Sequence, residues 1–234
     1  MNKNFSGLIG ASTMVLGLVA SSGTAKASLS NGSFETGTFV PTYTDNGAGA
    51  EILPVGSTTI SGWQTITGQV DWDVTPAFGL TAQDGTKFLD LTDDERGPIG
   101  GVEQLVALTA GTDYKVTFYI GSSGKYNIGT TQPTITTSIG GAQSQTFTGH
   151  GYSAPAAGEW QEFTYDFTVA TTGNFMLALQ GGSTGSASGP NEYVGLDNVS
   201  ITAVPEASTA IAGALLLLPF GASALRIWRK NGSK

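Results

Sequence analysis

A regular alternation of apolar and polar residues constrains the fold of this chain more than any other feature. Between Gln161 and Val169, every second residue is apolar: Phe163, Tyr165, Phe167 and Val169. The segment from Tyr114 to Ile120 repeats the pattern, with Lys115, Thr117 and Tyr119 between its apolar residues. A period of two is that of a β-strand with one buried and one exposed face.

Further strand-like segments follow one another without a long helical stretch between them. They span residues 57–60, 69–74, 87–91, 101–108, 134–139, 143–148, 175–179 and 193–203. The chain has 34 glycines and only 12% charged residues, which suits short strands joined by turns. The sequence therefore predicts an all-β fold, a single antiparallel β-sandwich.

Both ends of the chain are typical of targeting segments rather than of the folded domain. Lys3, the apolar stretch 8–20 and an Ala-Lys-Ala site at 25–27 predict a signal peptide over residues 1–27. A first transmembrane helix is the alternative, but the apolar stretch is short for one. The β-sandwich domain then spans residues 28–203.

The segment 204–234 contains Pro205 and Glu206, an apolar run and a basic cluster that ends at Lys230. Residues 207–228 are close to the ~20 residues that a transmembrane helix needs. Basic residues on its C-terminal side alone predict that this end stays cytoplasmic and that the domain is exported. An ordinary C-terminal anchor has the same features.

This order of Pro-Glu, apolar helix and basic tail resembles the PEP-CTERM sorting signal of Gram-negative bacteria, although Ala207 stands where a second proline is common. The resemblance implies processing by an exosortase, often in species that make exopolysaccharide. It also implies an inner-membrane anchor before processing and a place at the cell surface or in the extracellular matrix afterwards.

The charge balance of the domain limits its partners. Residues 28–203 contain four basic and 17 acidic residues, so the domain repels nucleic acid and, unless cations bridge them, acidic polysaccharide. The chain has no cysteine, which excludes disulfides and thiolate metal sites. Calcium is the hard cation that suits exported acidic proteins.

The two ends of the domain carry a second informative pattern. It opens with Asn31-Gly32-Ser33-Phe34-Glu35 and closes on a strand that contains Asp197. A period of two places Asp197 on the same face as Val199 and Ile201, toward packed apolar residues. A buried ionised carboxylate needs a partner or a metal ion.

These ends resemble galactose-binding-like β-sandwich (jelly-roll) domains, which include many carbohydrate-binding modules and the choice-of-anchor C proteins. The matching pieces lie in family order at 31–35, 60–63, 68–72, 84–91, 101–104, 114–118 and 196–199. The resemblance implies a structural calcium ion with carboxylates from Glu35 and Asp197 and carbonyls from around Asn31 and Lys87. The alternative makes Glu35 an exposed strand-end residue and Asp197 a turn former.

Aromatic side chains outside the core are candidates for stacking on sugar rings. Tyr119 lies on the polar face of its strand, and Tyr126 and Tyr193 flank loops, where binding residues concentrate. Gln104 can add hydrogen bonds to sugar hydroxyls. Trp63 and Trp72 are expected in the core.

Enzyme activity is not expected. Asp93, Asp94 and Glu103 could supply paired carboxylates, but a solvated acidic loop is the commoner explanation of such a run. The single histidine, His150, lies in a Gly-rich loop. The sequence therefore favours a non-catalytic exported protein that binds carbohydrate such as exopolysaccharide; the alternative is a structural or adhesive surface protein that binds another protein.

Overall fold

The structure is a computed structural model. It describes residues 27, 29–45, 48–92, 98–123, 131–140, 143–151, 159–184 and 193–204. In these ranges no helix is long and apolar enough to cross a membrane. The expected signal peptide and sorting segment lie outside them, apart from one residue of each, so both stay predictions.

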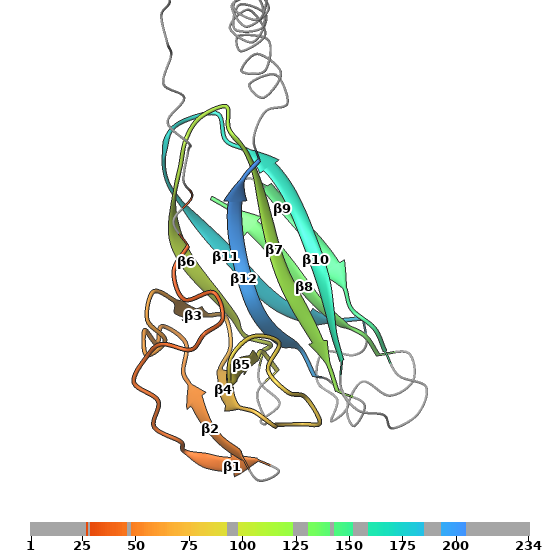
Figure 1. The fold of residues 1–234 in the computed structure, drawn as a ribbon. Coiled ribbons are helices and arrows are strands. Elements are labelled where there is room, and N and C mark those ends of the chain that lie inside the picture. The colour runs from red at the N-terminus through yellow and green to blue at the C-terminus, as the bar shows by residue number, and fades with distance from the viewer. Residues whose placement is uncertain are drawn as a thin grey trace, which may run out of the picture.

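The described residues form strands but no α-helix. The strands are β1 (Tyr43–Asp45), β2 (Ala48–Leu53), β3 (Gln64–Ile66), β4 (Val70–Val74), β5 (Lys87–Asp90), β6 (Gly101–Leu108), β7 (Asp113–Ser122), β8 (Pro133–Ile139), β9 (Gln143–Thr148), β10 (Glu159–Thr168), β11 (Gly173–Ser183) and β12 (Gly195–Ala203). One sheet has seven strands in the order β1-β2-β4-β5-β12-β7-β10, and the other has five in the order β3-β6-β11-β8-β9. Every pairing is antiparallel, and Figure 1 shows the two sheets as two layers. The predicted antiparallel β-sandwich is confirmed.

The alternating residues meet between the two sheets as the sequence predicts. Phe118 on β7 stacks on Phe163 of β10 at 6.0 Å between ring centroids, and it meets Phe147 of the other sheet at 5.3 Å. Trp63 and Trp72 are both almost fully buried in this core, as expected. Burial of these inner faces is the main source of stability in such a fold.

The strands in the first part of the domain differ from the prediction. Residues 57–60 are not a strand: Ser57 donates to the carbonyl of Pro54, and Ile60 alone forms an isolated bridge, with Gly37. Strands β1, β2 and β3 lie instead in segments that the sequence reading left unassigned. These strands are short and lie close to turns. Their alternation of apolar and polar residues is therefore interrupted before it can identify a strand.

A β-bulge in β12 overturns the expected orientation of Asp197. The register against β7 shifts between Asp197 and Ser200, and Asn198 adopts a φ of 48°. Asp197 pairs with Tyr119, whereas Ile201 pairs with the core residue Val116. The extra residue of the bulge therefore turns Asp197 to the outer face of the seven-stranded sheet, opposite to the expected one.

The connection between β4 and β5, residues 75–86, folds over this outer face; we term it the covering loop. Its residues Ala77, Phe78 and Leu80 form a second apolar cluster with Phe88 and Tyr193. Trp160 packs against the cluster, with its ring 5.6 Å from that of Phe88. One outer face of the sandwich is thus partly buried under its own chain.

Two leucines of the five-stranded sheet provide a matched test of this core. Leu177 on β11 is fully buried, whereas Leu105 on β6 is 56% exposed. We expect Leu177→Ala to lower the free energy of unfolding by about 2–5 kcal/mol, because it leaves a cavity between the sheets. Leu105→Ala should change it by no more than about 0.5 kcal/mol. Urea unfolding measures both, and equal losses would contradict the described orientation of the sheet.

Candidate functional site

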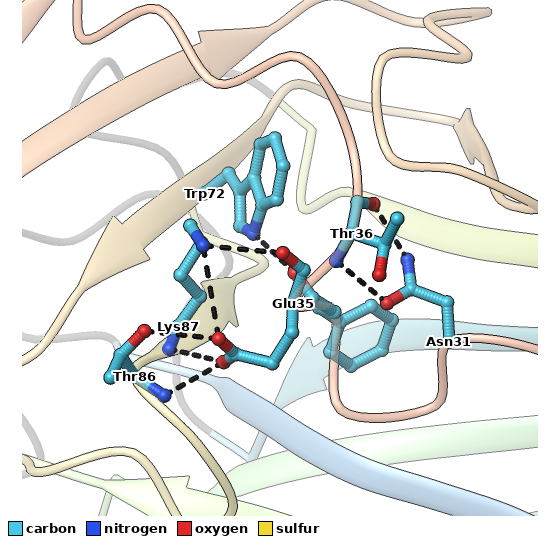
Figure 2. Close-up of polar contacts among 7 residues, drawn as sticks. Asn31, Glu35, Thr36, Trp72, Thr86 and Lys87 are labelled. Atoms are coloured by element: carbon cyan, nitrogen blue, oxygen red, sulfur yellow. Dashed lines mark hydrogen bonds and ion pairs between the residues drawn. The ribbon is translucent and has the colours of Figure 1, made fainter.

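Glu35 holds the end of the covering loop. Its Oε1 accepts hydrogen bonds from the backbone N–H groups of Thr86 at 2.8 Å and Lys87 at 2.6 Å (Figure 2). Its Oε2 accepts a bond from the Thr86 hydroxyl and lies 3.7 Å from Lys87 Nζ. Gly85 has a φ of 76°, and a Cβ there would lie 2.5 Å from the Glu35 carboxyl carbon. Glycine is therefore required where the carboxylate approaches the loop.

Asp197 holds the same loop at a position just before the residues that Glu35 binds. Its Oδ2 accepts N–H bonds from Gln83 at 2.7 Å and Asp84 at 3.0 Å, and its Oδ1 accepts one from Asn198. The side chain is fully buried. Burial raises the pKa of the Asp197 carboxyl to about 7, although the three N–H donors lower it and the neighbouring Asp84 adds to the rise.

The segment around Asn31 is fixed from the other side. The Asn31 amide donates to the carbonyl of Thr36 and accepts the N–H of Thr36 (Figure 2). It also donates to the carbonyl of Ser61. Its backbone carbonyl accepts bonds from the Trp63 indole and from Phe34. The matching motif at residues 31–35 thus ties the start of the domain to the core.

These residues do not fit the calcium site that the resemblance implies. Calcium needs six to eight oxygen ligands around one point, but here both carboxylates and the Asn31 carbonyl face N–H or O–H donors. The ammonium group of Lys87, which also donates to the Glu35 carbonyl at 3.2 Å, already supplies the positive charge beside Glu35. Within the described ranges no group of three or more His, Cys, Asp or Glu residues could hold a metal ion. Calcium binding stays a prediction that this geometry does not support.

The structure does not bring the predicted sugar-binding residues together. Tyr119 lies on the outer face of β7, where its hydroxyl donates to Glu162 at 2.9 Å, and this bond raises its pKa. Tyr193 is 1% exposed in the second apolar cluster, so its ring is not open to a ligand. Gln104 is buried and exchanges hydrogen bonds with the backbone of Ser30. Tyr126 lies outside the described residues.

Sequence reasoning also missed the position of Trp160. This indole lies over Gly121 and Gly195, where an added Cβ would come within 2.6 Å and 3.1 Å of its ring, and it donates to the Thr81 carbonyl at 2.6 Å. Its register with Gly121 places it on the same outer face as Tyr119 and Glu162. Extending the alternation of β10 one step toward the N-terminus would have found it.

The outer face of the five-stranded sheet presents an ordered array of hydroxyl groups. On β8 and β9, three pairs lie directly opposite each other: Thr134 with Thr148, Thr136 with Thr146, and Ser138 with Ser144. We term these six residues the hydroxyl face. Those on β9 are exposed. Those on β8 are partly exposed and alternate with buried residues that point into the core. The hydroxyl oxygens of Thr136 and Thr146 lie 2.8 Å apart.

This face is neutral and has no bulky cover among the described residues. Strands β8, β9 and β11 contain no charged residue. Glu103 on β6 is the single charged residue in the five strands of this sheet. Beside the hydroxyl face, the exposed Leu105 lies opposite Met176 and adds an apolar strip. The chain as a whole carries a net charge of −8, so this neutral surface stands apart from its surroundings.

The comparison with protein families gives this surface a context. Residues 26–188 match the model of a carbohydrate binding domain family, CBM_4_9. The chain belongs to this carbohydrate-binding domain family. No curated protein matches the chain.

Solved structures share the fold at low sequence identity. The Stig cyclase Fisc from Fischerella sp. TAU is 19% identical over 78% of this chain and 99% of that chain, with a TM-score of 0.51. An apo cyclase from Fischerella sp. is 20% identical over 78% and 98%, also with a TM-score of 0.51. A CBM4 structure is 17% identical over 76% and 100%, with a TM-score of 0.41. The likeness to the two cyclases shows the fold of this carbohydrate-binding domain.

Of the residues that could supply catalytic groups, the structure describes Glu103 and His150. Glu103 lies on the outer face of β6, and Asp93 and Asp94 lie outside the described residues. His150 Nδ1 lies 2.7 Å from Glu159 Oε1 at a largely exposed position.

Asp197 makes stability depend on pH. Its pKa rises from an ordinary 3.8 to about 7, so the folded state binds this proton more tightly than the unfolded state. The resulting stabilisation is fully present below about pH 4 and is lost as pH rises to about 7, with an upper limit of about 4 kcal/mol. We expect the melting temperature, measured with a chelator present, to fall between pH 5 and pH 8. The fall should be smaller in Asp197→Asn, and parallel curves for the two proteins would contradict the account.

Proposed function

We propose that this protein is a non-catalytic carbohydrate-binding protein whose ligand lies across the hydroxyl face. Family membership over residues 26–188 carries the carbohydrate-binding part of the proposal. The place on the molecule is supported by the paired hydroxyls of β8 and β9, which form a neutral surface that is exposed on β9 and partly exposed on β8. Such hydroxyls both donate and accept, as the hydroxyls of a sugar do.

The opposite outer face is a poorer surface for a long glycan. The covering loop occupies the part over β5 and β12, where Phe78 and Tyr193 are buried. At the far edge, β10 carries the exposed carboxylates of Glu162 and Asp166 on this face. An extended polysaccharide would have to cross both a folded loop and these two carboxylates. Within the described residues, the outer face of the five-stranded sheet has no such loop over it and a single carboxylate in its strands, that of Glu103 on β6.

The charge pattern favours a neutral polysaccharide. The net charge of −8 repels uronic acid or sulfated chains at a distance, and the hydroxyl face has no cation to bind their acid groups. The apolar strip of Leu105 and Met176 can contact the apolar side of a sugar ring. The specific proposal is an uncharged exopolysaccharide bound along the sheet.

Export and sorting form part of the same proposal. The signal peptide at 1–27 and the PEP-CTERM-like segment at 204–234 support delivery across the inner membrane of a Gram-negative bacterium and processing by an exosortase. A surface polysaccharide is then the ligand that the domain meets. The alternative, a structural or adhesive protein that binds another protein, uses the same route.

A substitution on the hydroxyl face tests the binding site. We expect Thr136→Glu to weaken retention on an immobilised neutral polysaccharide at least about tenfold, because it places an unpaired charge under the ligand. Thr117→Glu is the matched control: Thr117 is also partly exposed, but it lies on the outer face of the other sheet and should leave binding unchanged. Binding is measured with the full chain on a panel of neutral and acidic polysaccharides, whose chain length is checked after incubation.

Three results would overturn parts of this proposal. Equal weakening by the two variants would remove the hydroxyl face as the site. Shortened polysaccharide would show that the protein is an enzyme. Absence of binding across the panel would leave the structural or adhesive alternative.

Cell fractionation tests the export proposal separately. In a Gram-negative host with an exosortase, we expect the domain at the cell surface or in the matrix, and without the exosortase in the inner membrane. Full-length protein in the cytosol would contradict the export reading, and identical distribution in both hosts would contradict the sorting reading.

A further inference from the structure

Strand β9 is an edge strand without the usual protection against pairing. The two sheets have four edge strands: β1, β10, β3 and β9. Of these, β1 and β3 are only three residues long. β10 is ten residues long but carries Glu159, Glu162 and Asp166. β9 has six residues, no charge and no proline, and five of them are exposed. Natural proteins commonly blunt a long edge with charge, proline or a bulge.

The hydrogen-bond register shows which backbone groups β9 turns outward. Gly149 N donates to the Pro133 carbonyl at 2.8 Å, so this pair is hydrogen-bonded across the β8–β9 ladder. Hydrogen-bonded and non-hydrogen-bonded pairs alternate in an antiparallel ladder. Gln143, Gln145 and Phe147 therefore bond to β8, and Ser144, Thr146 and Thr148 direct their N–H and C=O groups away from it. Among the described strands, β9 pairs with β8 alone.

The sequence of β9 is suited to a second copy of itself. Around Thr146 it reads Ser, Gln, Thr, Phe, Thr, so hydroxyl residues lie two positions away on both sides. In antiparallel self-pairing about Thr146, Ser144 of one copy lies opposite Thr148 of the other, on the same face. Cross-strand pairs of hydroxyl residues are favourable neighbours.

Charge also permits this contact between two acidic chains. Each copy carries a net charge of −8, so most contacts between copies bring like charges together. β9 and its neighbour β8 in the same sheet contain no charged residue. β10 of the other sheet also packs against β9, through Phe147 with Phe163, but the alternation turns Glu162 and Asp166 to the outer face of that sheet, and Glu159 meets His150. Two copies can therefore meet at this edge without facing carboxylates from β8 or β9.

We propose that two copies of this chain pair through β9, antiparallel and centred on Thr146, to form one continuous sheet. This interface has twofold symmetry and uses the β9 edge of both copies, so the assembly closes at two copies. The joined sheet places the two hydroxyl faces side by side on one surface. If the proposed function is right, a long polysaccharide then crosses both copies, and each adds half of the binding surface.

Cysteine cross-linking tests the pairing, and the natural chain contains no cysteine to interfere. In Thr146→Cys the two Cα atoms lie about 5.5 Å apart, which suits a disulfide. We expect oxidised glutathione to convert most of the full-length chain to a covalent dimer on non-reducing electrophoresis. The double variant Ser144→Cys with Thr148→Cys should also cross-link, because these positions face each other between copies.

Two single variants are the controls. In Thr148→Cys the two thiols lie more than about 13 Å apart along the strand, and in Thr164→Cys they lie on the other sheet, so neither should cross-link. Failure of Thr146→Cys, or equal cross-linking in all single variants, would overturn the proposal. Neither result bears on the Thr136→Glu binding test, so failure of the pairing and failure of the carbohydrate site can be told apart.

Discussion

The structure depends on how two carboxylates from distant parts of the chain hold one loop. Asp197 binds the backbone of Gln83 and Asp84, and Glu35 binds that of Thr86 and Lys87. These bonds join the first segment, the last strand and the β4–β5 connection at one place. With its end fixed, the covering loop can fold back and bury Phe78 and Leu80 on the outer face of the seven-stranded sheet. Burial of Asp197 is the cost of this arrangement, and it is expressed in the raised pKa.

This asymmetry leaves the two outer faces with different properties. The seven-stranded sheet carries the covering loop, Trp160 and the acidic edge of β10, so its outer face is partly packed and partly charged. The five-stranded sheet keeps an outer face of small hydroxyl side chains on β8 and β9. Its hydroxyl side chains donate and accept hydrogen bonds, as sugar hydroxyls do. This match in chemistry is the reason that the carbohydrate site is proposed on this face.

The sequence predicted the sandwich well because burial of one strand face leaves a period of two. It identified β7 and β10 closely and placed Trp63 and Trp72 in the core. It misplaced Asp197, because the bulge at Asn198 inserts a residue that no alternation reveals. It took Gln104 and Tyr193 for ligand contacts, because long-range burial decides whether a polar tip meets the backbone or water. The hydroxyl face was also missed, since its six residues become an array only through the β8–β9 register.

The central claim is that the outer face of the five-stranded sheet holds the glycan. Amide hydrogen exchange of the full chain, with and without a neutral polysaccharide that it retains, tests this most directly. The account predicts slower exchange in β8, β9 and β11 on binding and little change in β10 and the covering loop. Protection centred on Tyr119, Trp160 and the covering loop would contradict it.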